Sequence, residues 1–367
     1  MYKKTITLLN TPNITFENIE EKNKKLLGNV NIARNLINNV NPESWNKIRK
    51  LTNIYEDPGS SFNLRDNSPL KKFVISRAFY KLWEILEAIK VPMISETFHI
   101  CDAPGGFVQA AVYYTKNRCD VYHTMSLKNN SYDVPSYNIK FLKKISNKIN
   151  ILDVSEDNDI TDIQTILKTV KLLRGNRIGF ITADGGINDV DYNNKETSHI
   201  KLISCQILLS LLVLQDNGVF ILKVFDTFSE DTMMIVSLLV SVFDTVSISK
   251  PVTSRPTNSE KYILCEGFSN KLFNEEKRNW LLKFCMTECL KCSGKHITEN
   301  DNDVFKQLYV INRELVEAQI DSIEKTLDIL KESYRDCRIL DFYTRKKNVF
   351  CKNFFIRYRL PFLLKSH

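Results

Sequence analysis

Apolar residues in the middle of the chain occur in short continuous runs, the pattern of strands that are buried on both faces of a sheet. One run ends at Ile100, and further strands are predicted at residues 120–125, 149–154, 177–184, 219–222, 245–249 and 262–265. Segments with apolar residues at helical spacing lie between these runs. The alternation predicts a parallel sheet covered by helices on both faces, with room for an antiparallel strand at its edge.

The predicted helices have recognisable ends. Ser68 is a good N-cap and Pro69 a good first residue for a helix over Leu70–Lys90, because Ser accepts a hydrogen bond from the first turn and Pro has no N–H to leave unpaired there. Asn217-Gly218 is predicted to close an almost wholly apolar helix over Glu196–Gln215. Other helices are predicted at residues 108–114, 161–173 and 231–243. The fold class is therefore α/β, of the Rossmann-like type.

The chain is predicted to comprise an N-terminal extension, an α/β domain and a helical C-terminal region, at residues 1–65, 66–270 and 271–367. The extension is polar, with a helical patch at Glu17–Ile37 and a loop signal at Asn41-Pro42. The C-terminal region has predicted helices at Asn274–Leu290 and Val304–Leu330, and a basic end at 345–359. That end interleaves aromatic side chains with cations, a pattern that can bind nucleic acid. An amphipathic helix docked on its own domain is the preferred interpretation.

Composition and charge narrow the class of protein. Hydrophobic residues make up 43% of the 367 residues and charged residues 26%, which suits an ordinary packed core. The formal net charge of +8 suits a polyanionic partner. Nine irregularly spaced cysteines and a start without an apolar leader lead us to expect reduced thiols in the cytoplasm. Leu202–Leu214 is too short and too polar to span a bilayer, so we expect no membrane partner.

A glycine turn follows the first predicted strand and precedes a helix, with the sequence Cys101-Asp102-Ala103-Pro104-Gly105-Gly106-Phe107. Glycines let the backbone approach a ligand closely, and a helix N-terminus directs N–H groups at it. Two adjacent glycines are not the dinucleotide fingerprint, and no Gly-Lys-Ser/Thr follows as in a P-loop. By itself the segment is equally compatible with a tight turn that binds nothing.

Four charged residues occupy positions that are often functional in α/β folds. They are Lys81 within a helix, Asp184 and Lys223 at the ends of two strands, and Glu260 just before the last strand. The carboxyl ends of neighbouring strands meet at the edge where such sheets bind ligands. A nearby cation and partial burial both lower the pKa of a lysine. A fraction of the lysine is then neutral and can accept a proton as a base. Each residue alone is equally well explained as a solvated lysine or a salt bridge. Together with the glycine turn, the four indicate an active site.

In this order, the four residues resemble the K-D-K-E tetrad of the FtsJ-like ribose 2′-O-methyltransferases. Arg77–Leu82 resembles the first-lysine motif of that family, and Cys101–Phe107 resembles its S-adenosylmethionine loop. The resemblance covers about residues 70–268. It is strongest to the mRNA cap branch, including Adrift-type enzymes and homologues in large cytoplasmic DNA viruses, and it includes Lys250-Pro251 through Glu260. A viral member would act in the host cytoplasm or the virion.

The resemblance implies S-adenosylmethionine as the methyl donor and a ribose 2′-OH near a capped mRNA 5′ end as the acceptor, with RNA and other capping enzymes as partners. It makes Lys223 the base, positioned and tuned by Lys81, Asp184 and Glu260. A methyltransferase of rRNA or tRNA and a catalytically silent RNA-binding capping subunit are the alternatives. The intact tetrad argues against the silent subunit.

The resemblance also implies cofactor contacts from Asp102, Pro104, Gly105, Gly106, Phe107, Ser126, Asp159 and Asp184. Many family members carry an acid at the position of His99 and another after the second strand, where this sequence has Ser126. The cofactor ribose would then be held by Asp102, by Ser126 or by the backbone. An N-cap for the helix at Thr161 explains Asp159 equally well.

A cysteine trio, Cys285, Cys289 and Cys292, is followed by His296. The four side chains could bind zinc, and the cysteine spacing is similar to an iron–sulfur motif. However, this spacing also places the three cysteines on one face of a helix, where Cys packs as a small hydrophobe. We expect core packing and no metal.

Overall fold

The structure is a computed structural model, and it describes residues 2–6, 19–56, 58, 74–89, 91, 94–129, 134–173, 178–187, 193, 195–287, 301–358 and 360. Within these residues, eight strands form one mixed sheet in the order β1-β7-β8-β6-β5-β2-β3-β4. Their bounds are β1 Tyr2–Ile6, β2 Glu96–Ile100, β3 Val121–Met125, β4 Ile149–Ile151, β5 Ile178–Ala183, β6 Leu214–Val224, β7 Phe243–Lys250 and β8 Lys261–Phe268. The strands from β4 to β6 pair in parallel, as predicted.

Antiparallel pairing occurs at the β1 edge of the sheet, where an antiparallel strand was allowed for, and also inside the sheet at β8. The loop of residues 251–260 returns the chain after β7, so that β8 pairs antiparallel with both β7 and β6. The edge beside β7 is filled by β1, a strand that the sequence analysis does not predict. The hairpin has a consequence for the site, because it places Glu260 at the start of β8, close to the end of β6 that holds Lys223.

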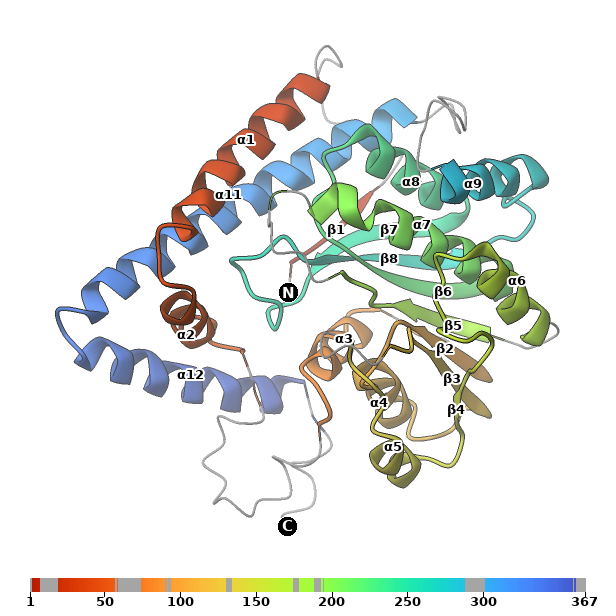
Figure 1. Cartoon of the computed structure of the whole chain (residues 1–367), viewed down its shortest axis with the longest axis horizontal. Coiled ribbons are helices and arrows are strands. Elements are labelled where there is room, and N and C mark those ends of the chain that lie inside the picture. Colours follow the sequence, from red (N-terminus) through yellow and green to blue (C-terminus); the bar gives the residue numbers. More distant parts are fainter. Residues whose placement is uncertain are drawn as a thin grey trace.

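Helices cover both faces of the sheet, which confirms the predicted α/β class (Figure 1). Side chains alternate along the strands, so that Phe180 and Ile221 join one apolar core while Ile181 and Phe220 join the other. The first core is covered by α3 Ala78–Leu86 and α4 Gly106–Tyr114, with α5 Ile139–Ile145 beside α4. The second is covered by α6 Ile163–Leu172, α7 Lys195–Val213 and α8 Glu230–Val240.

The helix α7 is long and apolar enough to cross a membrane by length and composition, but most of it is buried inside the protein. Its side chains at Cys205, Ile207 and Leu209 are fully covered. The apolar character of α7 is therefore explained by its packing against one face of the sheet.

The two terminal regions pack against each other on one side of the molecule (Figure 1). The helix α1 Ile19–Ile37 lies along α11 Asp301–Ser333, and α2 Pro42–Thr52 packs on α11 and on α12 Arg338–Arg357. The helix α9 Glu275–Thr287 packs on α7. Phe355 of α12 is buried, with its ring centroid 6.1 Å from that of Tyr80 in α3. The prediction that the basic end docks on its own domain is confirmed.

Two turn signals have a different role from the predicted one. Asn41 begins a helix, because its side chain accepts hydrogen bonds from the backbone N–H groups of Glu43 and Ser44. Asn217-Gly218 does not close α7 but lies within β6, where Asn217 has a φ of 60° and the register with β5 shifts. The signal marks a bulge, which also favours residues that tolerate a positive φ. The predicted N-cap at Ser68-Pro69 lies outside the described residues, but the helix expected over Leu70–Lys90 is shorter than predicted, because α3 begins only at Ala78 and ends at Leu86.

Candidate active site

The four charged residues singled out in the sequence converge as two ion pairs. The Lys223 ammonium lies 3.3 Å from Oδ1 of Asp184, where β6 and β5 end side by side. The Lys81 ammonium, on α3, lies 2.7 Å from Oε1 of Glu260, at the start of β8. All four side chains are between 11% and 14% exposed. The pairs therefore sit in a setting shielded from water, but open enough for a substrate to reach them.

Further groups, which the sequence interpretation missed, fix the two carboxylates. The hydroxyl of Tyr262 donates to Oδ1 of Asp184 at 3.1 Å. The hydroxyl of Ser254 donates to Oε1 of Glu260 at 2.8 Å. Tyr262 faces Lys223 across the β6–β8 pair, so a correct strand register would have identified it.

The pKa of Lys223 is raised, contrary to the expectation that burial and a second cation would lower it. Burial does lower the pKa, but the Asp184 and Glu260 carboxylates and the hydrogen bond to Asp184 outweigh that effect. Burial also raises the pKa of Glu260, yet Lys81 and Lys223 bring it well below its usual range. Lys223 and Glu260 are therefore both charged at neutral pH.

The turn after β5 is held from the apolar helix α7. The backbone N–H of Gly185 donates to Oε1 of Gln206 at 2.9 Å, and a Cβ at Gly185 would lie 2.5 Å from that oxygen. A Cβ at Gly186 would lie 3.2 Å from the Lys223 ammonium nitrogen. Small residues at these positions thus keep space around Lys223 and let Gln206 fix the backbone next to Asp184.

The glycine turn after β2 requires its glycines for conformation and for space. Gly105 has a φ of 115°, a left-handed conformation that side chains disfavour. A Cβ at Gly106 would lie 2.2 Å from Oγ of Ser76 and 2.9 Å from Cβ of Ala78, so the turn packs directly against the start of α3. Pro104 follows Ala103 through a cis peptide bond. The turn is compact and brings α4 close to the helix that carries Lys81.

Asp102 and Ser126 both form hydrogen bonds inside the protein. The Asp102 carboxylate accepts from the backbone N–H groups of Phe107 and Val108, at 2.7 and 2.8 Å. The expected free N–H groups at the start of α4 are therefore partly taken by this side chain. Burial raises the pKa of Asp102 to about 8. The hydroxyl of Ser126 accepts a hydrogen bond from the N–H of Ala103 at 2.8 Å, so it stabilises the backbone of the turn.

Three acids surround Cys101 at the same edge of the sheet. The pKa of the Cys101 thiol is raised to about 12, chiefly by burial, with Lys223 opposing the rise and Asp184, Asp159 and Asp102 adding to it. Asp159 is half-buried and accepts from the N–H and the hydroxyl of Thr161 at 2.9 and 2.8 Å. The N-cap of α6 is Asp162 and not Asp159. The edge therefore offers several carboxylate acceptors to a ligand with ammonium, hydroxyl or amine donors.

His99 occupies a fully buried position on β2. Its two ring nitrogens lie 2.8 Å from the hydroxyl of Thr182 and 3.0 Å from that of Thr97. Burial lowers its pKa to about 3. A neutral imidazole held by two hydroxyls makes His99 a structural member of the sheet rather than a titrating group.

The loop of residues 251–260, which ends in Glu260, is clamped by two carboxylates. Glu84 of α3 accepts from the backbone N–H of Val252 at 2.8 Å. Glu56, which comes before the α/β domain in sequence, lies 2.5 Å from Nη2 of Arg255 and 3.2 Å from Nη1 of Arg77. Burial raises the pKa of Glu56, but these arginines bring it below its ordinary value. Sequence reasoning missed Glu56 because its partners are remote in the chain.

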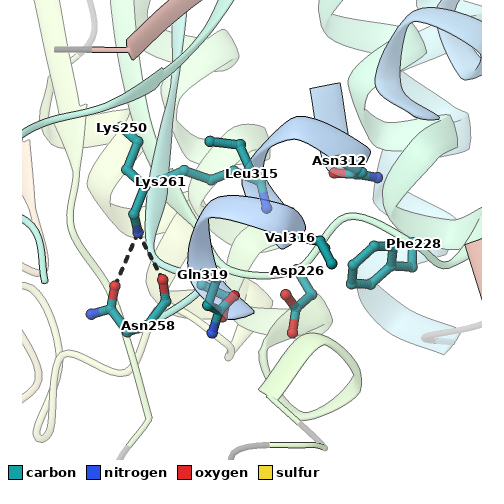
Figure 2. Close-up of a pocket in the computed structure, with 10 residues that line it drawn as sticks. Asp226, Phe228, Lys250, Asn258, Lys261, Asn312, Leu315, Val316 and Gln319 are labelled. Carbon is teal, nitrogen blue, oxygen red and sulfur yellow. Dashed lines mark hydrogen bonds between the residues drawn. The ribbon is translucent and has the colours of Figure 1, made fainter. Parts of the chain in front are cut away.

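A polar pocket lies behind this loop, between it and α11 (Figure 2). The Lys250 ammonium donates to the backbone oxygens of Asn258 and Glu260 at 2.7 and 2.8 Å. Burial lowers the pKa of Lys250 to about 7 and that of Lys261 to about 8. Lys250 thus supports the backbone that leads into Glu260, whereas the Lys261 side chain donates to the backbone oxygen of Phe225.

The structure describes one member of the cysteine trio. Cys285, on α9, is buried in the second core, in agreement with the packing interpretation. Cys289, Cys292 and His296 lie outside the described residues. The residues that are described contain no group of three or more His, Cys, Asp or Glu side chains suited to a metal ion.

The chain matches the family model described as FtsJ-like methyltransferase over residues 74–268. It is 29% identical over 264 residues to a cap-specific mRNA (nucleoside-2′-O-)-methyltransferase 1 of Dictyostelium discoideum, covering 66% of this chain and 34% of that protein. It is 30% identical over 248 residues to a cap-specific mRNA (nucleoside-2′-O-)-methyltransferase of Autographa californica nuclear polyhedrosis virus, covering 65% of this chain and 88% of that protein.

Among solved structures, one described as a ribosomal RNA methyltransferase from Plasmodium falciparum has a TM-score of 0.36 and 21% identity, over 53% of this chain and 97% of that chain. The chain spans 34% of the length of the Dictyostelium relative and 25% of the length of a human one with the same description.

Proposed function

The chain belongs to the FtsJ-like methyltransferase family, and on this premise we propose that it transfers a methyl group from S-adenosylmethionine to a ribose 2′-OH near the capped 5′ end of mRNA. The observation that supports this most is the pair of ion pairs, Lys223 with Asp184 and Lys81 with Glu260, beside the glycine turn. Capped mRNA is proposed as the substrate because the cellular and viral relatives carry it in their descriptions.

In this proposal the 2′-OH lies against the side-chain nitrogen of Lys223, and the neutral amine form of Lys223 takes the hydroxyl proton as the methyl group is transferred. Asp184 holds Lys223 from two sides, since its backbone oxygen accepts from the ammonium at 2.6 Å in addition to the carboxylate contact. The Lys81–Glu260 pair supplies a second fixed charge pair to orient the ribose. The protein mainly aligns the nucleophile with the donor, which is how positioned reactants gain rate.

The residues of the glycine turn and the acids around Cys101 fit S-adenosylmethionine. That molecule presents an ammonium group, a ribose diol and an adenine amine, all of which are donors, and Asp159 and Asp184 are acceptors at the same edge. When bound, the cofactor supplies an electrophilic methyl group on a sulfonium. Asp102 and Ser126 are assigned to shaping the turn, because their oxygens already accept from its backbone. Gly105 and Gly106 keep the turn compact.

A cytoplasmic location remains part of the proposal. It is supported by the described cysteines, which are all free thiols, namely Cys101, Cys119, Cys205, Cys265, Cys285, Cys337 and Cys351. Association with other capping enzymes is likewise proposed from the substrate alone.

The test is methyl transfer from S-adenosylmethionine labelled in its methyl group to three RNAs: capped, uncapped with the same sequence, and an rRNA fragment. Nuclease digestion of the product then locates the label. We expect label on a ribose 2′-oxygen close to the cap of the capped RNA. Transfer to the rRNA fragment with none to capped RNA would reject the mRNA assignment, and label on a base would reject the reaction itself.

A further inference from the structure

A second pocket opens next to the proposed active site, on the side of the N-terminal helices. It is lined by Arg34, Trp45, Arg49, Lys195, Asn258 and Ser259, among others. Arg34 belongs to α1, and Trp45 and Arg49 belong to α2. All three lie outside the segment that matches the family model. We call this space the N-terminal cationic pocket.

The charge of this pocket points to an anionic ligand. Three of its lining side chains are cationic, and none of the described residues that line it is acidic. Arg34 is 4% exposed and holds the buried Asp226 at 2.9 Å, so its position is fixed. Arg49 and Lys195 are both half-buried, which leaves part of each side chain accessible from outside. Partly buried cations interact more strongly with an anion than fully solvated ones do.

The pocket lies close to the tetrad in space and in the chain. The Lys195 ammonium lies 5.1 Å from the ring centroid of Phe225, and the Lys223 ammonium lies 5.8 Å from the same centroid. Ser259, on the pocket wall, directly precedes Glu260 in the chain. Gln319 of α11 lines this pocket and also the neighbouring one, where Figure 2 shows it with Asn258. The Lys195 side chain of the pocket and the Lys223 side chain of the tetrad therefore lie near the same aromatic ring.

We propose that the N-terminal cationic pocket binds a phosphodiester group of the RNA strand whose ribose lies at Lys223. This rests on the proposed function, since it takes the substrate to be RNA. The phosphates on either side of a ribose are covalently attached to it, so a strand in the active site must pass its phosphates over the adjoining surface. The cationic side chains of Arg49 and Lys195 contact the phosphates of that strand. Arg34, which is paired with Asp226, holds α1 in place at the wall of the pocket. The N-terminal extension is thereby part of the substrate-binding surface.

The experiment measures binding of a capped, unstructured 15-nucleotide RNA by fluorescence anisotropy at several salt concentrations. We expect Arg49→Ala and Lys195→Ala each to raise the Kd by about fivefold and to reduce the slope of log Kd against log salt by about 0.7, the value for one lost contact to a single strand. Arg49→Lys and Lys195→Arg should retain most of the affinity. Lys168→Ala, an exposed position on α6 at the far end of the molecule in Figure 1, is the matched control.

A second measurement uses the wild-type protein, so it does not depend on how the variants fold. Lysine acetylation is followed by mass spectrometry with and without the RNA, and we expect protection of Lys195 but not of Lys168. Unchanged affinity in both alanine variants together with an unprotected Lys195 would overturn the proposal. So would equal protection of Lys195 by polyglutamate at the same charge concentration, because this would indicate an acidic protein partner.

The outcome is separable from that of the proposed function. Failure of the wild-type protein to methylate any RNA would reject the activity, whereas the binding and protection data would still establish or exclude this pocket as a phosphate site. Methylation by the wild type with unaltered RNA binding in the variants would keep the activity and reject the pocket.

Discussion

The Lys223 ammonium contacts Asp184 at two different oxygens, 2.6 Å from the backbone carbonyl and 3.3 Å from the carboxylate. The carbonyl is part of the turn that Gln206 holds through Gly185. The ammonium is therefore positioned by the fold of the β5 turn as well as by a charge. Removing only the charge of Asp184 should leave the Lys223 side chain close to its position, because the contact to the carbonyl remains. Removing the Lys223 side chain should leave the turn intact, because Gln206 still holds it.

Replacing Lys223 should separate catalysis from cofactor binding. We expect Lys223→Ala to abolish methyl transfer and to change the Kd for S-adenosylmethionine less than about twofold, because Lys223 is assigned to the 2′-OH proton. Lys223→Arg should also be inactive, since a guanidinium stays protonated near neutral pH. Transfer assays and calorimetric cofactor titration check this, with Lys168→Ala as the control. Wild-type turnover by either Lys223 variant contradicts the assignment.

The reaction should accelerate with rising pH. The pKa of Lys223 is raised above its ordinary value of 10.5 because Asp184 and Glu260 outweigh burial. Its neutral, proton-accepting form is thus scarce at pH 7 and becomes about tenfold more abundant with each pH unit. We expect log kcat/KM to climb steadily between about pH 7 and about pH 9. A plateau in that range would mean that another group accepts the proton.

Glu56 should act as a positioning residue from outside the family-matched segment. We expect Glu56→Gln to lower kcat by about tenfold, because Arg255 loses its counter-ion next to Ser254, which binds Glu260. Glu56→Asp should recover part of the rate, and Glu43→Gln, on the exposed side of α2, should have no effect. If kcat were unchanged and RNA binding became tighter, Glu56 would instead be shown to keep Arg77 and Arg255 from binding the substrate.

The Arg34–Asp226 pair should contribute to stability. Both side chains are 4% exposed, so Arg34→Met leaves a buried carboxylate without its cation. We expect a loss of about 3–5 kcal/mol in urea denaturation, and a smaller loss for Arg34→Met combined with Asp226→Leu. Lys331→Met breaks an exposed pair and should cost at most about 1 kcal/mol. A cost for Arg34→Met as small as this control would show that the pair is not coupled.

Cys285 should behave as a core residue. It is buried in the second core, so Cys285→Ala should cost on the order of 1–2 kcal/mol in the free energy of unfolding. The purified protein should contain no stoichiometric zinc or iron by elemental analysis. About one zinc per chain, with unfolding of the C-terminal region by a chelator, would contradict the packing interpretation.

The sequence by itself determined the elements whose signal is local. Continuous apolar runs identified strands such as β5 and β6, and the order of Lys81, Asp184, Lys223 and Glu260 predicted one site. Parallel strand order makes the ends of neighbouring strands meet, so Asp184 and Lys223 could be placed together from pattern alone.

Only the tertiary structure decided the properties that depend on partners remote in the chain. The sign of the Lys223 pKa shift required the distances to two carboxylates, which outweigh the burial that the sequence suggested. The strand β1 and the contacts of Glu56 and Arg34 come from a polar extension whose local pattern carries little apolar signal. The place of β8 between β6 and β7 is set by a hairpin, and a local pattern does not specify which neighbour a strand will pair with.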